Sequence, residues 1–208
     1  MKQRVFSSGR ISALSDGVFA VAMTLLVLEL KLPPLDPSAD RGVVTAVVVE
    51  QFPRFISWIL SFAILCRLWI IHHGLLQTGN MRSSSFMTWN FVFLGVIAFI
   101  PFPASFMSEH HDQALSIFIF SATYLVAGLA LAAMAVAYRS QLEAAGASTE
   151  ARSMSRAVAI IVATALVSCL LALFYPWLGV LVWVVYPFAS ALGARMRIPE
   201  NSPTENGS

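Results

Sequence analysis

The sequence predicts an all-α, polytopic membrane protein with six transmembrane helices per subunit. Of its 208 residues, 58% are hydrophobic and only 12% charged, and the mean hydropathy is +0.75, whereas soluble domains carry roughly a quarter charged residues. A helix needs about 20 mainly apolar residues to cross a bilayer, because hydrocarbon offers its backbone no hydrogen-bond partner. The sequence offers such segments at about 11–32, 43–76, 86–107, 114–138, 157–175 and 177–194.

Prolines mark the ends of the first and third expected spans. The first stops at Pro33 and Pro34, since proline has no N–H and disfavours helix in the residue before it. The second is too long for one perpendicular crossing, so either it tilts strongly or its first turns lie outside the bilayer. The third closes through Pro101 and Pro103.

The last three expected spans carry fewer signals than the first three. The fourth is rich in small residues, which let helices approach closely in lipid. We expect a polar connection at 140–155, and Pro176 separates the two short final spans. The chain then forms a single six-helix channel domain over 1–198, followed by a disordered cytoplasmic tail at 199–208.

An even number of spans places both termini on one side of the membrane, and the basic residues indicate which side. Loops that face the cytoplasm carry an excess of lysine and arginine. We therefore expect a multi-pass cell-membrane protein with both termini cytoplasmic. The termini's side would carry Lys2, Arg4, Arg10, Arg82, Arg139, Arg152, Arg156, Arg195 and Arg197, and the other side only Lys31, Arg41 and Arg54.

Composition and motifs also argue against several classes of function. A net charge of +2, with scattered basic residues, is too small for a nucleic-acid partner. Cys66 and Cys169 lie inside apolar runs, where a free thiol behaves as a small hydrophobe. The sequence has no Gly-rich phosphate loop and no activated-nucleophile motif, so we expect no enzyme and no cofactor. It also has no second copy of the first span.

The first span contains the most unusual feature, an aspartate near the start of a membrane helix. An ionisable residue there is costly unless paired, which makes Asp16 a candidate functional or assembly site. At 100° per residue, Val21, Thr24, Leu25 and Leu28 fall within one narrow stripe, whereas Asp16 projects about 140° away from Val21. If the stripe faced a central axis, Asp16 would point into the bundle, toward polar groups on later helices.

The first half of the chain combines Arg10, Leu14, Ser15 and Asp16, the apolar run after them, Trp69, His72 and Asn90, and a close at Pro101-Phe102-Pro103. This pattern resembles the endolysosomal potassium channel family (the transmembrane protein 175 family), in particular its six-span prokaryotic members. The family usually has phenylalanine at the position of Leu14, a departure that removes one aromatic contact. The resemblance covers the first half of the chain; for the last three spans only the hydropathy agrees.

The resemblance implies a homotetramer in the lipid bilayer, with the first helix of each subunit lining a pore for K⁺ and other monovalent cations. The carbonyl filter string of ordinary potassium channels is absent from the sequence. Carried over by position, Val21, Leu25 and Leu28 would form hydrophobic constrictions, and Thr24 would contribute to selectivity. The structural polar network would consist of Arg10, Ser15, Asp16, Trp69, His72 and Asn90.

Other interpretations of the same residues remain open at this point. An apolar stripe is more often ordinary packing or lipid contact than a gate. The Thr24 hydroxyl would also be satisfied by bonding back to its own helix. A proton-coupled secondary transporter using Asp16 and His72 is a second hypothesis, and a structural membrane subunit without transport activity is a third.

The four histidines suggest structural roles rather than a metal site. Adjacent His72 and His73 point about 100° apart, with no carboxylate or thiol at ligand spacing, which favours a hydrogen-bonded structural histidine. His110 and His111 are expected in an exposed polar loop, with weak metal binding or pH sensitivity left open.

Glu29 lies at the other end of the first span, beside the stripe. There it would concentrate cations at a pore mouth, unless pairing with Lys31 cancels its charge.

Overall fold

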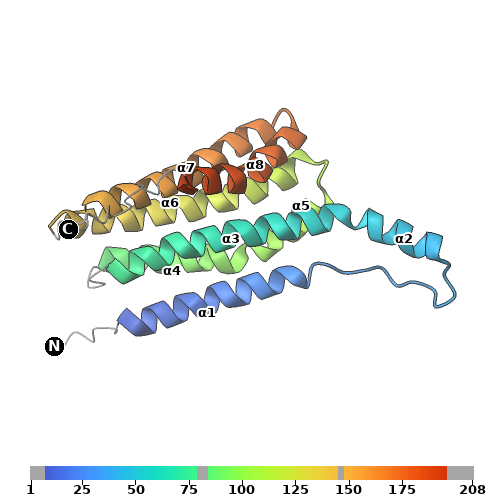
Figure 1. The fold of residues 1–208 in the computed structure, drawn as a ribbon, viewed down its shortest axis with the longest axis horizontal. Helices are drawn as coiled ribbons and strands as arrows, with labels where there is room; N and C mark the ends of the chain where they lie inside the picture. Colours follow the sequence, from blue (N-terminus) through green and yellow to red (C-terminus); the bar gives the residue numbers. More distant parts are fainter. Residues whose placement is uncertain (1–7, 79–83, 145–147, 196–208) are drawn as a thin grey trace, which may run out of the picture.

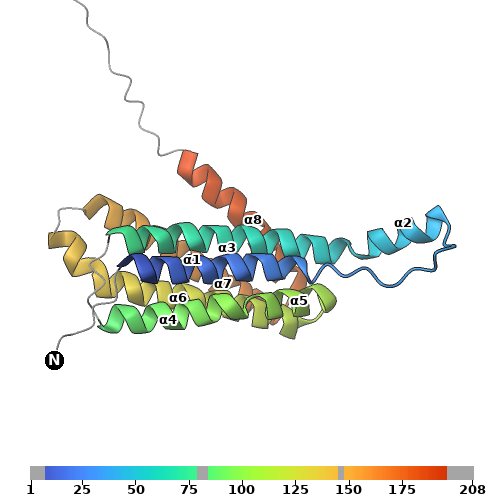
Figure 2. The same cartoon turned by 90° about the horizontal axis from the view of Figure 1, so that it is seen from below.

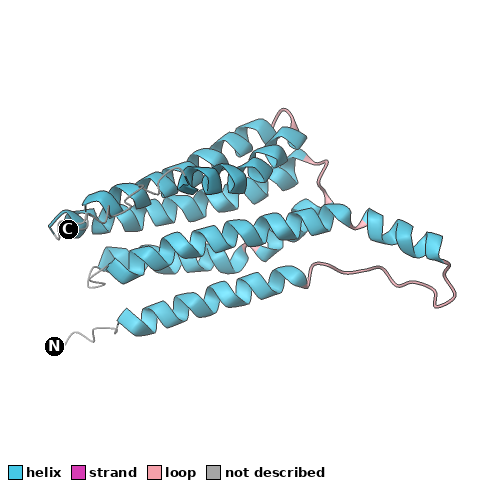
Figure 3. Ribbon diagram, viewed as in Figure 1, coloured by secondary structure: helices cyan, strands magenta, loops and turns pink. Residues whose placement is uncertain are grey.

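The computed structural model of the chain is a bundle of antiparallel α-helices (Figures 1 and 3). It describes residues 8–78, 84–144 and 148–195, and no strand occurs among them. The expected tail at 199–208 lies outside these residues. The helices are α1 (Ser8–Val27), α2 (Arg41–Glu50), α3 (Phe52–Thr78), α4 (Ser84–Phe99), α5 (Pro101–Glu109), α6 (Ala114–Ala144), α7 (Ser148–Ala172) and α8 (Pro176–Arg195).

Five stretches of the described chain are long and apolar enough to cross a membrane. A shorter apolar helix, Pro176–Tyr186, forms the first part of α8 and supplies a sixth apolar segment. The all-α, polytopic prediction is therefore confirmed. The five stretches are Gly9–Val27, Phe52–Gln77, Ser84–Glu109, Ala114–Ala137 and Arg152–Ala172.

The bundle has three layers in Figure 1, with α6, α7 and α8 on one side, α3 to α5 in the middle and α1 on the other side. Seen from below in Figure 2, α1 lies between α3 and α4, and it contacts α3, α4 and α5. The core is built where the middle layer meets α6. Its fully buried side chains include Leu65, Leu68, Phe93, Ile97, Phe120 and Tyr124.

The first helix is shorter than the expected span 11–32, because α1 ends at Val27. The N–H groups of Leu28, Glu29 and Leu30 bond to carbonyls three residues earlier, which tightens the chain out of the α-helix. Pro33 and Pro34 have no N–H to offer the carbonyls four residues before them, so an α-helix gains nothing by continuing. Leu28 thus lies just beyond α1 rather than inside it.

The expected span 43–76 consists of two helices, α2 and α3, separated at Gln51. Pro53 cannot donate to the carbonyl four residues earlier, which explains the interruption. The shorter of these two helices, α2, is capped by Asp40 and has no buried residue. It projects beyond the bundle (Figures 1 and 2). In the loop before it, the hydroxyl and N–H of Ser38 donate to Asp36 and lower the pKa of that carboxyl.

The third expected span is also interrupted, at Ile100 between α4 and α5. Pro101 and Pro103 have no N–H, so two closely spaced donors are missing and the pattern of helical hydrogen bonds is interrupted. The pattern resumes where the Ala104 N–H bonds to the Ile100 carbonyl. The helix then continues to Glu109, two residues past the expected end.

The polar stretch expected as a connection at 140–155 is mostly helical. The helix α6 continues to Ala144 and α7 begins at Ser148. Gln, Glu, Ala and Arg are good helix formers, and a helix outside hydrocarbon needs no apolar surface. Hydropathy locates the membrane-compatible part of a helix but not its ends.

Candidate pore face and its supporting contacts

One face of α1 packs against the rest of the subunit. Its buried side chains recur every three or four residues, the spacing that places them on one side of a helix. They meet α3, α4 and α5, so this face fixes how α1 is rotated. The buried residues are Ile11, Ser15, Phe19, Ala22 and Leu26.

The opposite face of α1 is uncovered and carries the predicted gate residues. Within α1, Val21 is 57% exposed and Leu25 40%, and Leu28, just beyond the end of the helix, is 60% exposed. Leu14, the departure from the family pattern, is exposed on the same face. The stripe predicted from 100° spacing is therefore a surface that no described part of this chain covers.

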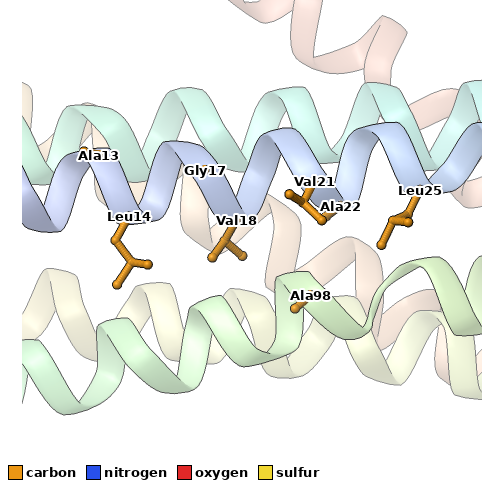
Figure 4. Close-up of a pocket in the computed structure, with 8 residues that line it drawn as sticks. All are labelled: Ala13, Leu14, Gly17, Val18, Val21, Ala22, Leu25 and Ala98. Carbon is orange, nitrogen blue, oxygen red and sulfur yellow. The ribbon is translucent and has the colours of Figure 1, made fainter.

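A groove of about 430 Å³ runs along this surface between α1 and α4 (Figure 4). The side chains that point into it from α1 are apolar, and Ala98 is the contribution from α4. Such a groove gives an ion nothing to replace its hydration shell. It is lined by Ala13, Leu14, Gly17, Val18, Val21, Ala22, Leu25 and Ala98.

Thr24 supplies the hydroxyl on the exposed side of α1. Its Oγ1 lies 2.9 Å from the carbonyl oxygens of both Ala20 and Val21, to which the hydroxyl donates. The back-bonded arrangement weighed in the sequence analysis is the one observed. The hydroxyl proton is therefore engaged, while the oxygen of this exposed residue can still accept a hydrogen bond or a cation.

Asp16 points away from this surface and into the bundle. Its carboxylate accepts a hydrogen bond of 2.8 Å from the indole N–H of Trp69 on α3, and it lies 3.9 Å from Nδ1 of His73. The rings of Trp69 and His73 stack at 5.1 Å, and Gln77 lies 2.7 Å from the other nitrogen of His73. A carboxylate in this place has both a donor and a neighbouring imidazole.

His72 and Asn90 form a second, deeper pair between α3 and α4. Nε2 of His72 lies 2.7 Å from Oδ1 of Asn90, and both residues are buried. The rings of Phe93 and Phe19 lie 4.9 and 5.9 Å from the His72 ring. A polar pair enclosed by aromatic rings has no access to water as a substitute partner, so each member depends on the other.

Two members of the expected network stand apart from these pairs. The hydroxyl of Ser15 donates to the Ile11 carbonyl of its own helix. Arg10 is exposed and is not among the hydrogen-bond and ion-pair partners of Asp16 in the described chain. The described contacts also join Asp16 to His73 rather than to His72, so they form no direct link for the proton-carrier hypothesis.

A set of contacts that sequence patterns do not predict lies where α1 stops. We call this end of the bundle the outer end. The hydroxyl of Ser105 on α5 donates to the Glu29 carboxylate at 2.5 Å, so Glu29 pairs with α5 and not with Lys31. Arg54 donates to the Lys31 carbonyl and lies 3.6 Å from Glu109. These partners are up to 76 residues apart, a separation that spacing rules do not reach.

Within the described chain, no three His, Cys, Asp or Glu side chains are grouped so as to hold a metal ion. His110 follows α5 and its ring meets Phe106, while its carbonyl accepts from Ser116. His111 is exposed and lines a polar cavity beside Arg54.

The sequence and fold match known channels. Residues 10–101 match the family model described as endosomal/lysosomal potassium channel TMEM175. A potassium channel of Chamaesiphon minutus is 37% identical over 109 residues, which cover 51% of this chain and 53% of that one. A potassium channel of Streptomyces collinus is 31% identical over 132 residues, covering 64% and 61% respectively. The chain thus spans about half to three fifths of the length of these curated relatives.

Two solved structures share the fold over nearly the whole chain. The crystal structure of a lysosomal potassium-selective channel TMEM175 homolog from Chamaesiphon minutus has a TM-score of 0.76 and 26% identity, covering 90% of this chain and 97% of that one. The potassium channel MtTMEM175 has a TM-score of 0.60 at 18% identity, covering 94% of each chain, and shows the fold alone. These relatives are named as channels, not enzymes. Residues 10–101, which carry the exposed α1 face and both polar pairs, are the part of the chain that is similar to the TMEM175 family.

Proposed function

We propose that four copies of this chain form a potassium-preferring cation channel, with the four α1 helices around the central axis. The observation that carries the proposal is the division of α1 into a buried face and an uncovered apolar face with one hydroxyl. The potassium-channel names of the relatives support the same conclusion. In such a tetramer, the uncovered face would line the pore.

The apolar side chains of that face would act as the gate. Four copies of Val21, Leu25 and Leu28 would form successive rings around the axis. A narrow ring of branched side chains expels water, and an ion that enters it loses hydration without compensation. The pore would therefore be closed wherever these rings approach closely and would conduct when they separate.

Thr24 would contribute to selectivity, because its oxygen would lie between the rings, where an entering cation loses part of its hydration shell. Its hydroxyl proton is engaged with carbonyls of its own helix, so the group offers lone pairs to the axis. Four hydroxyl oxygens would stabilise a partly dehydrated cation, whereas an anion would find no donor there.

The two polar pairs would hold α1 in register without contacting the ion. Asp16 binds Trp69 on the side of α1 opposite the gate residues, and His72 binds Asn90 one layer deeper. We further propose a location in the cell membrane with both termini cytoplasmic, because that side carries most of the expected loop arginines.

The test is cation flux through purified protein in liposomes, with potassium and sodium gradients compared. We expect a passive, proton-independent potassium flux, and the channel proposal fails if no ion is conducted. Thr24→Val keeps the shape of the side chain but removes its oxygen, so potassium preference should fall. Thr24→Ser keeps the hydroxyl and is the matched control. Flux that needs a proton gradient and disappears in Asp16→Asn would instead support a proton-coupled carrier.

A further inference from the structure

The exit of α1 is held at the outer end by side chains from two other helices. Leu28 is the first residue beyond α1. It begins a segment, 28–31, that has no α-helical hydrogen bonds of its own. Its N–H groups bond to carbonyls two or three residues earlier in the chain. The position of the Leu28 side chain therefore depends on the contacts that other helices make with this segment.

Ser105 on α5 contacts the segment 28–31. The Ser105 hydroxyl donates to the carboxylate of Glu29, the residue directly after Leu28. Both side chains are partly buried, so water competes little for the bond. Ser105 reaches this place because the break at Ile100 starts a new helix, α5, that packs against both α1 and α3.

Arg54, in the first turn of α3, contacts the same segment. Its Nη1 donates to the Lys31 carbonyl at 3.0 Å and to the Gln51 side chain at 2.9 Å, and its Nη2 lies 3.6 Å from Glu109. One guanidinium thus joins the exit of α1, the start of α3 and the end of α5. Its planar fork of donors allows these contacts at once, which a single ammonium could not match.

We propose that Ser105 and Arg54 are positioning residues for the outer gate ring, which is the ring that four copies of Leu28 would form. Together with Glu29, Lys31 and Glu109 they make a set of contacts that we call the outer clasp. The clasp fixes the segment 28–31 and so fixes how far Leu28 reaches toward the axis. This inference rests on the proposed channel function and deepens it, because it assigns the control of one constriction to side chains that never meet the ion. Opening of the outer ring would require the clasp to shift or release.

The clasp uses Glu29 as a hydrogen-bond acceptor, whereas a pore-mouth role would use its charge, and substitutions separate the two. Ser105→Ala removes the donor and leaves the charge. Glu29→Gln removes the charge and leaves an amide oxygen that can still accept from Ser105. Ser105→Thr keeps the hydroxyl and is the matched control.

Amide hydrogen exchange of the segment 28–31 in the reconstituted protein tests the clasp without reference to conduction. We expect Ser105→Ala to accelerate exchange several-fold at Leu28, Glu29 and Leu30, whose N–H groups are all bonded in the intact segment. Ser105→Thr and Glu29→Gln should exchange at close to the wild-type rate. Unchanged exchange in Ser105→Ala would overturn the clasp.

Single-channel recording then tests its effect on the gate. We expect Ser105→Ala to change open probability or conductance several-fold, and Glu29→Gln to have little effect. A fall in conductance in Glu29→Gln at low salt, with Ser105→Ala unchanged, would show that Glu29 acts by charge and would overturn the proposal. If wild-type protein conducts no ions, the proposed function fails, while the exchange measurement still decides whether the clasp exists.

Discussion

The side chains of Leu25 and Leu28 are 40% and 60% exposed in the subunit. Leu26, between them, is 1% exposed and part of the core. Adjacent positions on α1 thus differ in burial, because they lie at different angles around the helix.

Shortening or polarising the exposed leucines should weaken the gate. We expect Leu25→Ala and Leu28→Asn to raise conductance several-fold and to reduce potassium preference, because a wider or wetter ring no longer excludes hydrated ions. Planar-bilayer recording measures both effects. Val27→Ala is the matched control, since Val27 is 47% exposed but lies about 200° around the helix from Leu25. Equal currents in all three variants would remove these leucines from the gate.

The pair of His72 and Asn90 should matter for stability rather than for permeation. Asn90→Ala leaves the His72 N–H without an acceptor in a buried site, a loss of about 1–3 kcal/mol in the free energy of unfolding. Thermal melting of the detergent-solubilised protein should show a lower midpoint. Thr88→Ala on the same helix removes a hydroxyl that bonds only to its own backbone and should change the midpoint little. Equal midpoints for the two variants would mean that the buried pair contributes nothing.

At the scale of helices, the sequence predicts which stretches are helical far better than where they end. Apolar runs identify the spans because hydrocarbon tolerates little else. The end of α1 at Val27, the gap at Gln51 and the break at Ile100 depend on which carbonyls lose donors to prolines and what they bond instead. Prolines in the sequence mark the neighbourhood of these ends but not their residue.

The same difference appears in the contacts between helices. The angle between Asp16 and Val21 predicts that the carboxylate faces the bundle, and the Trp69 contact is found there. The bond between Glu29 and Ser105 follows no rule of local spacing, because it depends on the break that creates α5. Ser15 was grouped with the network from its place in the motif, yet its hydroxyl is satisfied within α1.

The contact between α1 and α3 leads to a prediction about assembly. Removing the carboxylate in Asp16→Ala leaves the Trp69 indole without its acceptor, so α1 should be held less firmly and fewer tetramers should form. Asp16→Asn keeps an acceptor oxygen and is the matched control. Native mass spectrometry measures the tetramer fraction, and bilayer recording measures the channels that remain. Full assembly of Asp16→Ala with altered permeation would place Asp16 on the pore side instead.

At the scale of the whole molecule, the antiparallel order of the helices fixes which loops share a side. The loop before α2 emerges at the outer end of the bundle, where α1 stops, and α8 returns toward the end where α1 begins (Figure 1). One labelling experiment therefore determines the orientation of the entire chain.

We expect the outer end to face away from the cytoplasm. A cysteine introduced by Pro37→Cys, at an exposed position of that loop, should react with a membrane-impermeant maleimide on intact cells. The wild-type protein, whose cysteines lie within the apolar spans, is the background control. Labelling that requires permeabilised cells would reverse the proposed orientation.

The apolar nature of the exposed α1 face has a consequence for how the protein is made. In the proposed tetramer, a newly synthesised subunit would enter the bilayer before it meets its partners. Each charged residue at the centre of a helix costs about 2.5 to 3.5 kcal/mol on insertion. A pore helix lined by valine and leucine avoids that cost, because lipid tails solvate it as readily as another subunit would. A lone subunit would therefore be stable in the membrane and would leak no ions while it waits, so one set of side chains serves both insertion and closure.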